Sequence, residues 1–170
     1  MESLMVANEK PILITGSHRS GTTWVGKMIR LSNKIVYIPE PFNKYHDPGI
    51  FGAKINYSYY AINEKNCNII ENYIDKTLNL NYNYFKALRN IRIHNKYSGM
   101  LNNAKEFTIG KILKRRPLLK DPLALFASEW LYSKYHFKII ILVRHPAAFL
   151  SSIKRLNYYF PFNDIFQQKK

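Results

Sequence analysis

The segment Pro11–Arg30 constrains the fold more than any other part of the chain. It begins with an apolar run, Pro11–Thr15, that has the length of a buried strand. Apolar residues then recur at helical spacing over 22–31. The residues between these patterns, which begin at Gly16, are enough for a tight loop. The segment therefore predicts a strand, a loop and a helix, in that order.

The predicted loop has the chemistry of an anion-binding site. Gly16 and Gly21 can adopt positive φ and let the backbone approach a ligand closely. The N–H groups of Ser20–Thr23 lie where a helix begins, so they lack an intrahelical partner and face the positive end of the helix dipole. The same four residues carry three hydroxyl groups, and Arg19 adds a permanent positive charge. We expect this loop to bind phosphate or sulfate.

The loop departs from the nucleotide-binding pattern G-x-x-x-x-G-K-[ST] at one position. Gly16, Gly21 and Thr23 match the pattern, but Thr22 stands where the lysine belongs. A nucleoside triphosphatase needs that lysine on the β- and γ-phosphates. The substitution disfavours ATP or GTP hydrolysis and leaves phosphate binding intact, with Arg19 as the cation of the loop.

A second strand, Ile35–Ile38, completes a βαβ unit that should be parallel and right-handed. Glu40 follows it between two prolines, and ligands of open α/β sheets bind beyond the carboxyl ends of the strands. We therefore expect Glu40 on the same rim as Arg19. There it could take a proton from an acceptor, or pair with Arg19 or a nearby lysine and fix the loop. His46 is the alternative base.

The last third of the chain predicts two more strands. Arg116–Lys120 is the third, and Asp121 after it can cap the following helix. Phe137–Val143 is a continuous apolar run, which suits a central parallel strand covered on both faces. It is followed by Arg144 and by a helix over 147–156. The pattern predicts an α/β fold with a mainly parallel sheet and helices on both faces.

Three helix candidates separate the second and third strands. They are residues 66–78, 84–93 and 101–113. We expect Tyr97–Gly99 to break the helical pattern between the last two. The sequence thus predicts one domain over 1–170, with a helical insertion at about 50–115 that lies on the acceptor side.

Composition limits the partners and the compartment. The formal net charge is +15, but the basic residues are scattered, so we predict no nucleic-acid partner. No apolar run is long enough to span a membrane, and the first residues lack a signal-peptide pattern. Cys67 is the single cysteine and cannot form an internal disulfide, so a cytoplasmic protein is expected. No His, Cys and Asp cluster has metal-ligand spacing, and no metal is predicted.

Two motifs resemble one enzyme family. His18–Trp24 reads HRSGTTW and resembles the 5′-phosphosulfate loop of sulfotransferases that use 3′-phosphoadenylyl sulfate (PAPS). Arg144–Ser152 is similar to the 3′-phosphate motif of the same family, an arginine at a strand end followed by a helix that carries a serine. The resemblance is close over 11–43 and 117–156, and weak between them. Two phosphate motifs in this order are more specific than either alone.

The resemblance implies a P-loop-like, three-layer α/β/α fold and a PAPS-dependent sulfotransferase that acts on a hydroxyl or amine of a small-molecule or glycan acceptor. It implies catalytic roles for Arg19 and Glu40, with Arg19 stabilising the leaving group. The residues it assigns to PAPS are Arg19, Ser20, Gly21, Thr22, Thr23, Trp24, Arg144 and Ser152.

Family members usually continue past the 3′-phosphate helix, so the resemblance also implies that the C-terminal part is lacking. The alternatives are a nucleoside or nucleotide kinase-like enzyme and an inactive nucleotide-binding fragment. Neither the acceptor nor the oligomeric state follows from the sequence.

Overall fold

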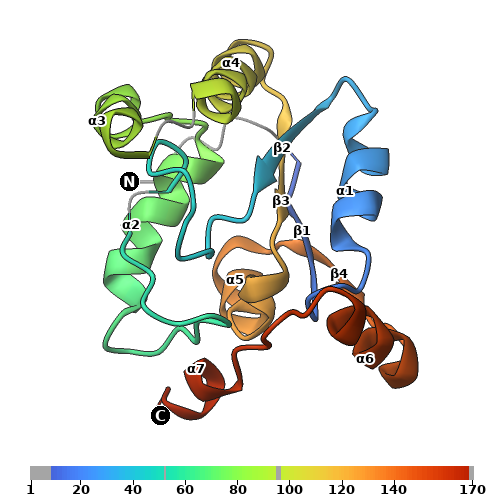
Figure 1. Ribbon diagram of the computed structural model, residues 1–170. Coiled ribbons are helices and arrows are strands. Elements are labelled where there is room, and N and C mark those ends of the chain that lie inside the picture. The colour runs from blue at the N-terminus through green and yellow to red at the C-terminus, as the bar shows by residue number, and fades with distance from the viewer. Residues whose placement is uncertain (1–8, 52, 95–96, 169–170) are drawn as a thin grey trace.

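The computed structural model describes residues 9–51, 53–94 and 97–168 (Figure 1). Its four strands form a parallel sheet in the order β2-β3-β1-β4. The strands are β1 (Ile12–Gly16), β2 (Ile35–Pro39), β3 (Arg116–Lys120) and β4 (Lys138–Leu142). The predicted parallel sheet is confirmed, and β1 and β3 are its two inner strands. Their carboxyl ends therefore meet in the middle of one rim.

The predicted helices are present, with two differences. The helical elements are α1 (Thr22–Arg30), α2 (Cys67–Leu78), α3 (Tyr84–His94), α4 (Tyr97–Ile112), the 3-10 helix η1 (Pro122–Leu125), α5 (Ser128–Tyr135), α6 (Pro146–Arg155) and α7 (Phe162–Phe166). The break expected at Tyr97–Gly99 is wrong, because α4 begins at Tyr97. The N–H groups of the first turn have no intrahelical partner, so a glycine there weakens a helix less than one in its interior. The helix expected after Asp121 is divided into η1 and α5.

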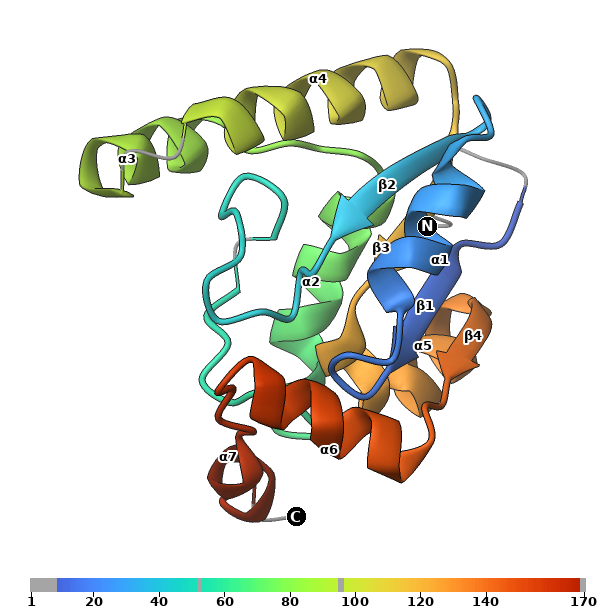
Figure 2. The same cartoon turned by 45° about the vertical axis from the view of Figure 1, so that its right-hand side comes forward.

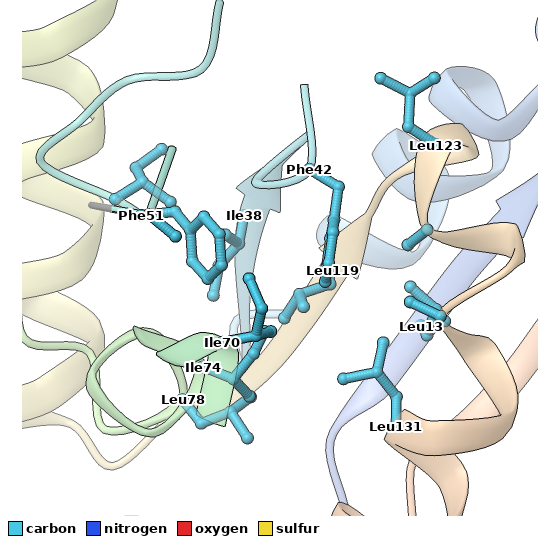
Figure 3. Packing of buried hydrophobic residues seen from close by; sticks show 14 of the residues in the cluster. Leu13, Ile38, Phe42, Phe51, Ile70, Ile74, Leu78, Leu119, Leu123 and Leu131 are labelled. Carbon is cyan, nitrogen blue, oxygen red and sulfur yellow. The ribbon is translucent and has the colours of Figure 1, made fainter. Parts of the chain in front are cut away.

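Helices cover both faces of the sheet, which gives three layers, α/β/α (Figure 1). On one face Ile12 and Ile14 of β1 pack with Val25 and Ile29 of α1. On the other face the alternate residues of the strands pack against the helices (Figure 3). That larger cluster includes Leu13, Ile38, Leu119, Ile70, Ile74 and Leu131. The insertion thus contributes its helix α2 to the main core.

The position of β4 differs from the prediction. The run Phe137–Val143 was expected to form a central strand covered on both faces, yet β4 pairs only with β1 among the described residues. Ile141 is 52% exposed and Val143 is 89% exposed. The apolar run identifies a strand, but the number of its neighbours depends on the rest of the sheet.

Candidate active site

The loop between β1 and α1 lies at the carboxyl end of β1, one of the two inner strands. Gly16 has φ 147°, and a Cβ there would lie 2.3 Å from the carbonyl oxygen of Leu142, so only glycine fits. Gly21 has φ 96° and precedes α1, and a Cβ there would meet no atom within 4 Å. The first turn of α1 has no acidic residue and no side-chain cap. The start of this helix is therefore accessible to an anion.

Arg19 connects the two predicted phosphate motifs. Its Nε donates to the Ser152 hydroxyl at 3.3 Å, and Arg144 Nη1 donates to the Arg19 carbonyl oxygen at 2.8 Å. Figure 2 shows α6, which carries Ser152, beside the loop that carries Arg19. Arg19 is 125 positions from Arg144 and 133 from Ser152 in the sequence, yet the three residues lie together. Ser152 is buried, whereas Arg19 and Arg144 are exposed.

The backbone of Arg19 is strained. Its φ is 65°, a left-handed conformation that a non-glycine residue adopts at a cost of about 1–2 kcal/mol. Such a conformation persists where surrounding contacts fix it, and it is common at functional sites. Here the bond from Arg144 holds the carbonyl of the strained residue. The loop is thus held in a particular shape by the second motif.

The other loop residues divide into inward and outward groups. The Ser20 hydroxyl and its N–H both bond to the Ser17 carbonyl oxygen, at 2.7 and 3.3 Å, and close the loop. Thr22 is buried at the start of α1, and Thr23 is exposed. Trp24 is 69% exposed, so its ring does not belong to the core. These placements leave the roles of the loop residues in PAPS binding as predictions.

Glu40 lies at the carboxyl end of β2, beside the end of β3. Its N–H donates to the Lys120 carbonyl oxygen at 2.9 Å, and its own φ is 42°. The Lys120 ammonium forms an ion pair with one carboxylate oxygen, and Asn43 Nδ2 donates to the other at 2.8 Å. Burial raises the pKa of Glu40, but the bonds from Lys120 and Asn43 outweigh burial and bring this pKa below its ordinary value. The carboxylate is therefore ionised at neutral pH.

Asp121 fixes the loop that carries Glu40. The side chain is fully buried, and it accepts hydrogen bonds from Phe42 N–H at 2.6 Å and from Leu123 N–H at 2.9 Å. Burial raises the pKa of Asp121 to about 7. The sequence predicted the cap of the following helix, which the bond to Leu123 confirms. The bond to Phe42 joins residues 79 positions apart, so no local pattern predicts it.

His46 and Lys120 both lie near Glu40. His46 Nδ1 bonds to the Asn43 carbonyl oxygen at 2.6 Å, and its ring packs against Phe51. It thus contacts the backbone of the Glu40 loop and remains the alternative base. Lys120 pairs with Glu40, as one of the readings from the sequence anticipated. The sequence indicated this pairing because Lys120 lies at the end of a predicted strand, on the rim shared with Glu40.

Neither a metal site nor a membrane span is found among the residues that the structure describes. No three His, Cys, Asp or Glu side chains gather there in a way that could hold a metal ion. In the same part of the chain, every helix is too short or too polar to cross a bilayer.

Comparison with known proteins identifies the family. The model of the sulfotransferase family matches residues 11–168. A search of curated proteins and a search of solved structures find no match to this chain. The family match spans both phosphate motifs and all four strands. The chain therefore belongs to the sulfotransferase family, whose members transfer sulfuryl groups.

Proposed function

We propose that this protein transfers a sulfuryl group from PAPS to a hydroxyl or amine of a small-molecule or glycan acceptor. The observation that supports this most is the contact of Arg19 with Ser152 and Arg144. It brings the loop suited to the 5′-phosphosulfate next to the pair suited to the 3′-phosphate. A donor that carries a 5′-phosphosulfate and a 3′-phosphate needs the loop and the arginine–serine pair on one rim.

The donor would be bound by cations whose present partners are neutral. Arg144 and Arg19 bond to a backbone carbonyl and a hydroxyl. A guanidinium has five N–H donors, so each arginine can form charge-assisted hydrogen bonds to phosphate oxygens while these contacts remain. The start of α1 would receive the 5′-phosphosulfate, and Arg144 with Ser152 the 3′-phosphate. Trp24 is exposed and could stack on the adenine.

The transfer needs one base and one group that stabilises negative charge. The bond between sulfur and the bridging oxygen of the donor breaks, and a bond forms between sulfur and the acceptor oxygen or nitrogen. The proton of the acceptor passes to the ionised carboxylate of Glu40. The negative charge of the leaving phosphate is offset by Arg19. Lys120, paired with Glu40, keeps that carboxylate ionised in the free protein.

The competing functions predict other ligands. A nucleotide kinase would bind ATP with Mg²⁺, and Thr22 in place of the lysine of the pattern disfavours it. A nucleotide-binding protein without catalysis would bind the donor and transfer nothing. The positions of Glu40 and Arg19 favour sulfuryl transfer over binding alone, since both residues lie on the same rim as the predicted donor site.

The test is calorimetric binding of 3′-phosphoadenosine 5′-phosphate, the product of PAPS. Adenosine 5′-phosphate and ATP–Mg²⁺ serve as comparison ligands. We expect binding that requires the 3′-phosphate and that weakens roughly 10- to 100-fold in Arg144→Ala, because a charged hydrogen bond contributes about 1.5–3 kcal/mol. Arg155→Ala removes the same charge from the exposed end of α6 and should leave affinity unchanged. Preference for ATP–Mg²⁺ would contradict the proposal.

A further inference from the structure

His18 and Tyr59 form a pair that the proposed function does not use. The His18 N–H donates to the Tyr59 hydroxyl oxygen at 3.0 Å, and His18 Nδ1 lies 2.7 Å from the same oxygen. Tyr59 is 2% exposed. One buried hydroxyl thus bonds to both the backbone and the ring of the residue that precedes Arg19.

The hydrogen-bond inventory assigns the protons of this pair. Burial raises the pKa of Tyr59 to about 12, so its hydroxyl keeps its proton at neutral pH. The Tyr59 oxygen accepts from the backbone N–H of His18, and the proton of the buried hydroxyl needs an acceptor of its own. Nδ1 of His18 is within reach. Nδ1 therefore accepts, and Nε2 carries the proton of a neutral ring.

The surroundings of His18 favour the neutral ring. Burial lowers the pKa of His18, and the positive charges of Lys120 and Arg19 act in the same direction. Glu40 opposes them with its negative charge. The ring also packs against Tyr158, with 5.6 Å between the ring centroids, on the segment that follows α6.

The bonds to His18 and Arg19 enclose the strained residue. On its N-terminal side the His18 N–H is held by Tyr59, and on its C-terminal side the Arg19 carbonyl is held by Arg144. A left-handed arginine needs such contacts to persist. The two contacts come from different parts of the chain, one from the insertion and one from the residues that follow β4.

We propose that Tyr59 is a positioning residue, whose hydroxyl acts through His18 to hold Arg19 in its left-handed conformation in the anion-binding loop. The role of this conformation in sulfuryl transfer rests on the proposed function. Tyr59 is itself held from the C-terminal side, because Gln168 Nε2 donates to its carbonyl oxygen at 2.9 Å. Asp164 accepts from the neighbouring Ser58 N–H at 2.8 Å and pairs with Lys44.

The first test needs no activity. Long-range ¹⁵N–¹H spectra of the histidine rings report which nitrogen carries the proton, and His18→Gln assigns the signals among the five histidines. We expect the neutral His18 ring of the wild type to carry its proton on Nε2, and we expect the pKa of His18 to lie below its ordinary value of 6.5. Tyr59→Phe removes the hydroxyl and keeps the ring that packs against Phe126 and Phe160. It should remove the chemical-shift signature of a hydrogen bond at Nδ1 and raise the pKa of His18, because the hydroxyl donates only to the neutral ring.

The matched control is Tyr60→Phe, which removes a hydroxyl from the next residue, whose ring also packs against the core. It should leave the His18 signals unchanged. Identical His18 spectra in the wild type and Tyr59→Phe would overturn the proposal, whatever the protein catalyses. So would an equal change in both variants.

The second test measures transfer from PAPS. Tyr59→Phe should lower kcat roughly 5- to 10-fold, the value of one hydrogen bond of about 1 kcal/mol, with little change in KM for PAPS. A changed His18 signal together with unchanged kcat would refute the role in transfer. If the wild type transfers nothing, the proposed function fails, and the ring spectra alone then decide whether Tyr59 holds the loop.

Discussion

The two sides of the candidate site differ in how their charges are satisfied. On the β2 and β3 side, Glu40 is paired with Lys120, and Asp121 is buried under two backbone N–H groups. On the β1 and β4 side, Arg19 and Arg144 are exposed, and the partners found for them in the described residues are neutral. One side is internally compensated, whereas the other keeps positive charge available.

This difference indicates a division of labour. Positive charge without a carboxylate partner can be offered to an anionic donor without first breaking an ion pair. A compensated carboxylate at a fixed position suits proton transfer, which depends on geometry before pKa. Mutations of the cations on the β1 and β4 side should therefore change donor binding, and mutations on the β2 and β3 side should change turnover or stability.

The largest effect is expected from Glu40→Gln. The amide keeps the size of the side chain but cannot accept the acceptor's proton, so kcat should fall roughly 10²- to 10⁴-fold. Binding of 3′-phosphoadenosine 5′-phosphate, measured by calorimetry, should stay within about a factor of two of wild type, since Glu40 lies on the compensated side.

His46→Gln is the comparison for this variant. His46 bonds to the backbone of the same loop, so both substitutions act on one segment. If His46→Gln lowers kcat more than Glu40→Gln does, the base is His46 and the division between the two sides has to be redrawn around it.

The sequence predicted the two sides unequally well. The loop around Arg19 and the motif around Arg144 are local patterns with their own chemistry, so both were found, and the structure brings them together. The bonds of Asp121 to Phe42 and of Tyr59 to His18 join residues with no shared pattern. Such pairs depend on which strands become neighbours, which local periodicity does not encode.

The strands illustrate the same limit. All four were predicted from short runs, and the sequence favoured the run that forms β4 for the centre of the sheet. The structure places β3 between β2 and β1, with Leu118 and Leu119 fully buried. It places β4 beside β1 alone among the described residues, with Ile141 half exposed. An apolar run establishes that a strand exists, and the pairing of the whole sheet establishes its burial.

A smaller effect is expected from Asp121→Asn. Asn has a single acceptor oxygen, so one of the two N–H groups of Phe42 and Leu123 loses its partner. The free energy of unfolding should fall by about 1–3 kcal/mol in urea denaturation. Glu129→Gln, on the exposed side of α5, is the control and should change it by less than about 0.5 kcal/mol. Equal losses of unfolding free energy in Asp121→Asn and Glu129→Gln would show that the compensated side is no more rigid than the exposed surface of α5.

The same variant tests the charge of Asp121 by pH. The folded-state pKa is raised to about 7 from an ordinary value of 3.8. Between these values the unfolded chain gives up the proton first, so the contribution of Asp121 to stability is full below pH 3.8 and is lost as pH rises toward 7. The stability difference between wild type and Asp121→Asn should therefore be larger at pH 4 than at pH 8. A difference that grows with pH would mean that the folded-state pKa of Asp121 lies below its ordinary value, which would contradict this prediction.

The smallest effect concerns backbone strain on the cationic side. Arg19→Ala and Arg19→Gly both remove the guanidinium and its bond to Ser152, and in the folded state they differ in the cost of φ 65°. Glycine adopts that conformation freely, although it loses more entropy on folding. We expect Arg19→Gly to be more stable than Arg19→Ala by about 0.5–1 kcal/mol in thermal unfolding.

The same exchange at Lys27, inside α1 and also exposed, should have the opposite sign. If Lys27→Gly and Arg19→Gly are both less stable than their alanine counterparts, Arg19 is not strained in solution. Arg144 and Tyr59 would then have no left-handed residue to hold, because the loop would already be relaxed before any donor binds. If the signs differ as expected, the cationic side stores strain that the insertion helps to maintain through the contact of Tyr59 with His18.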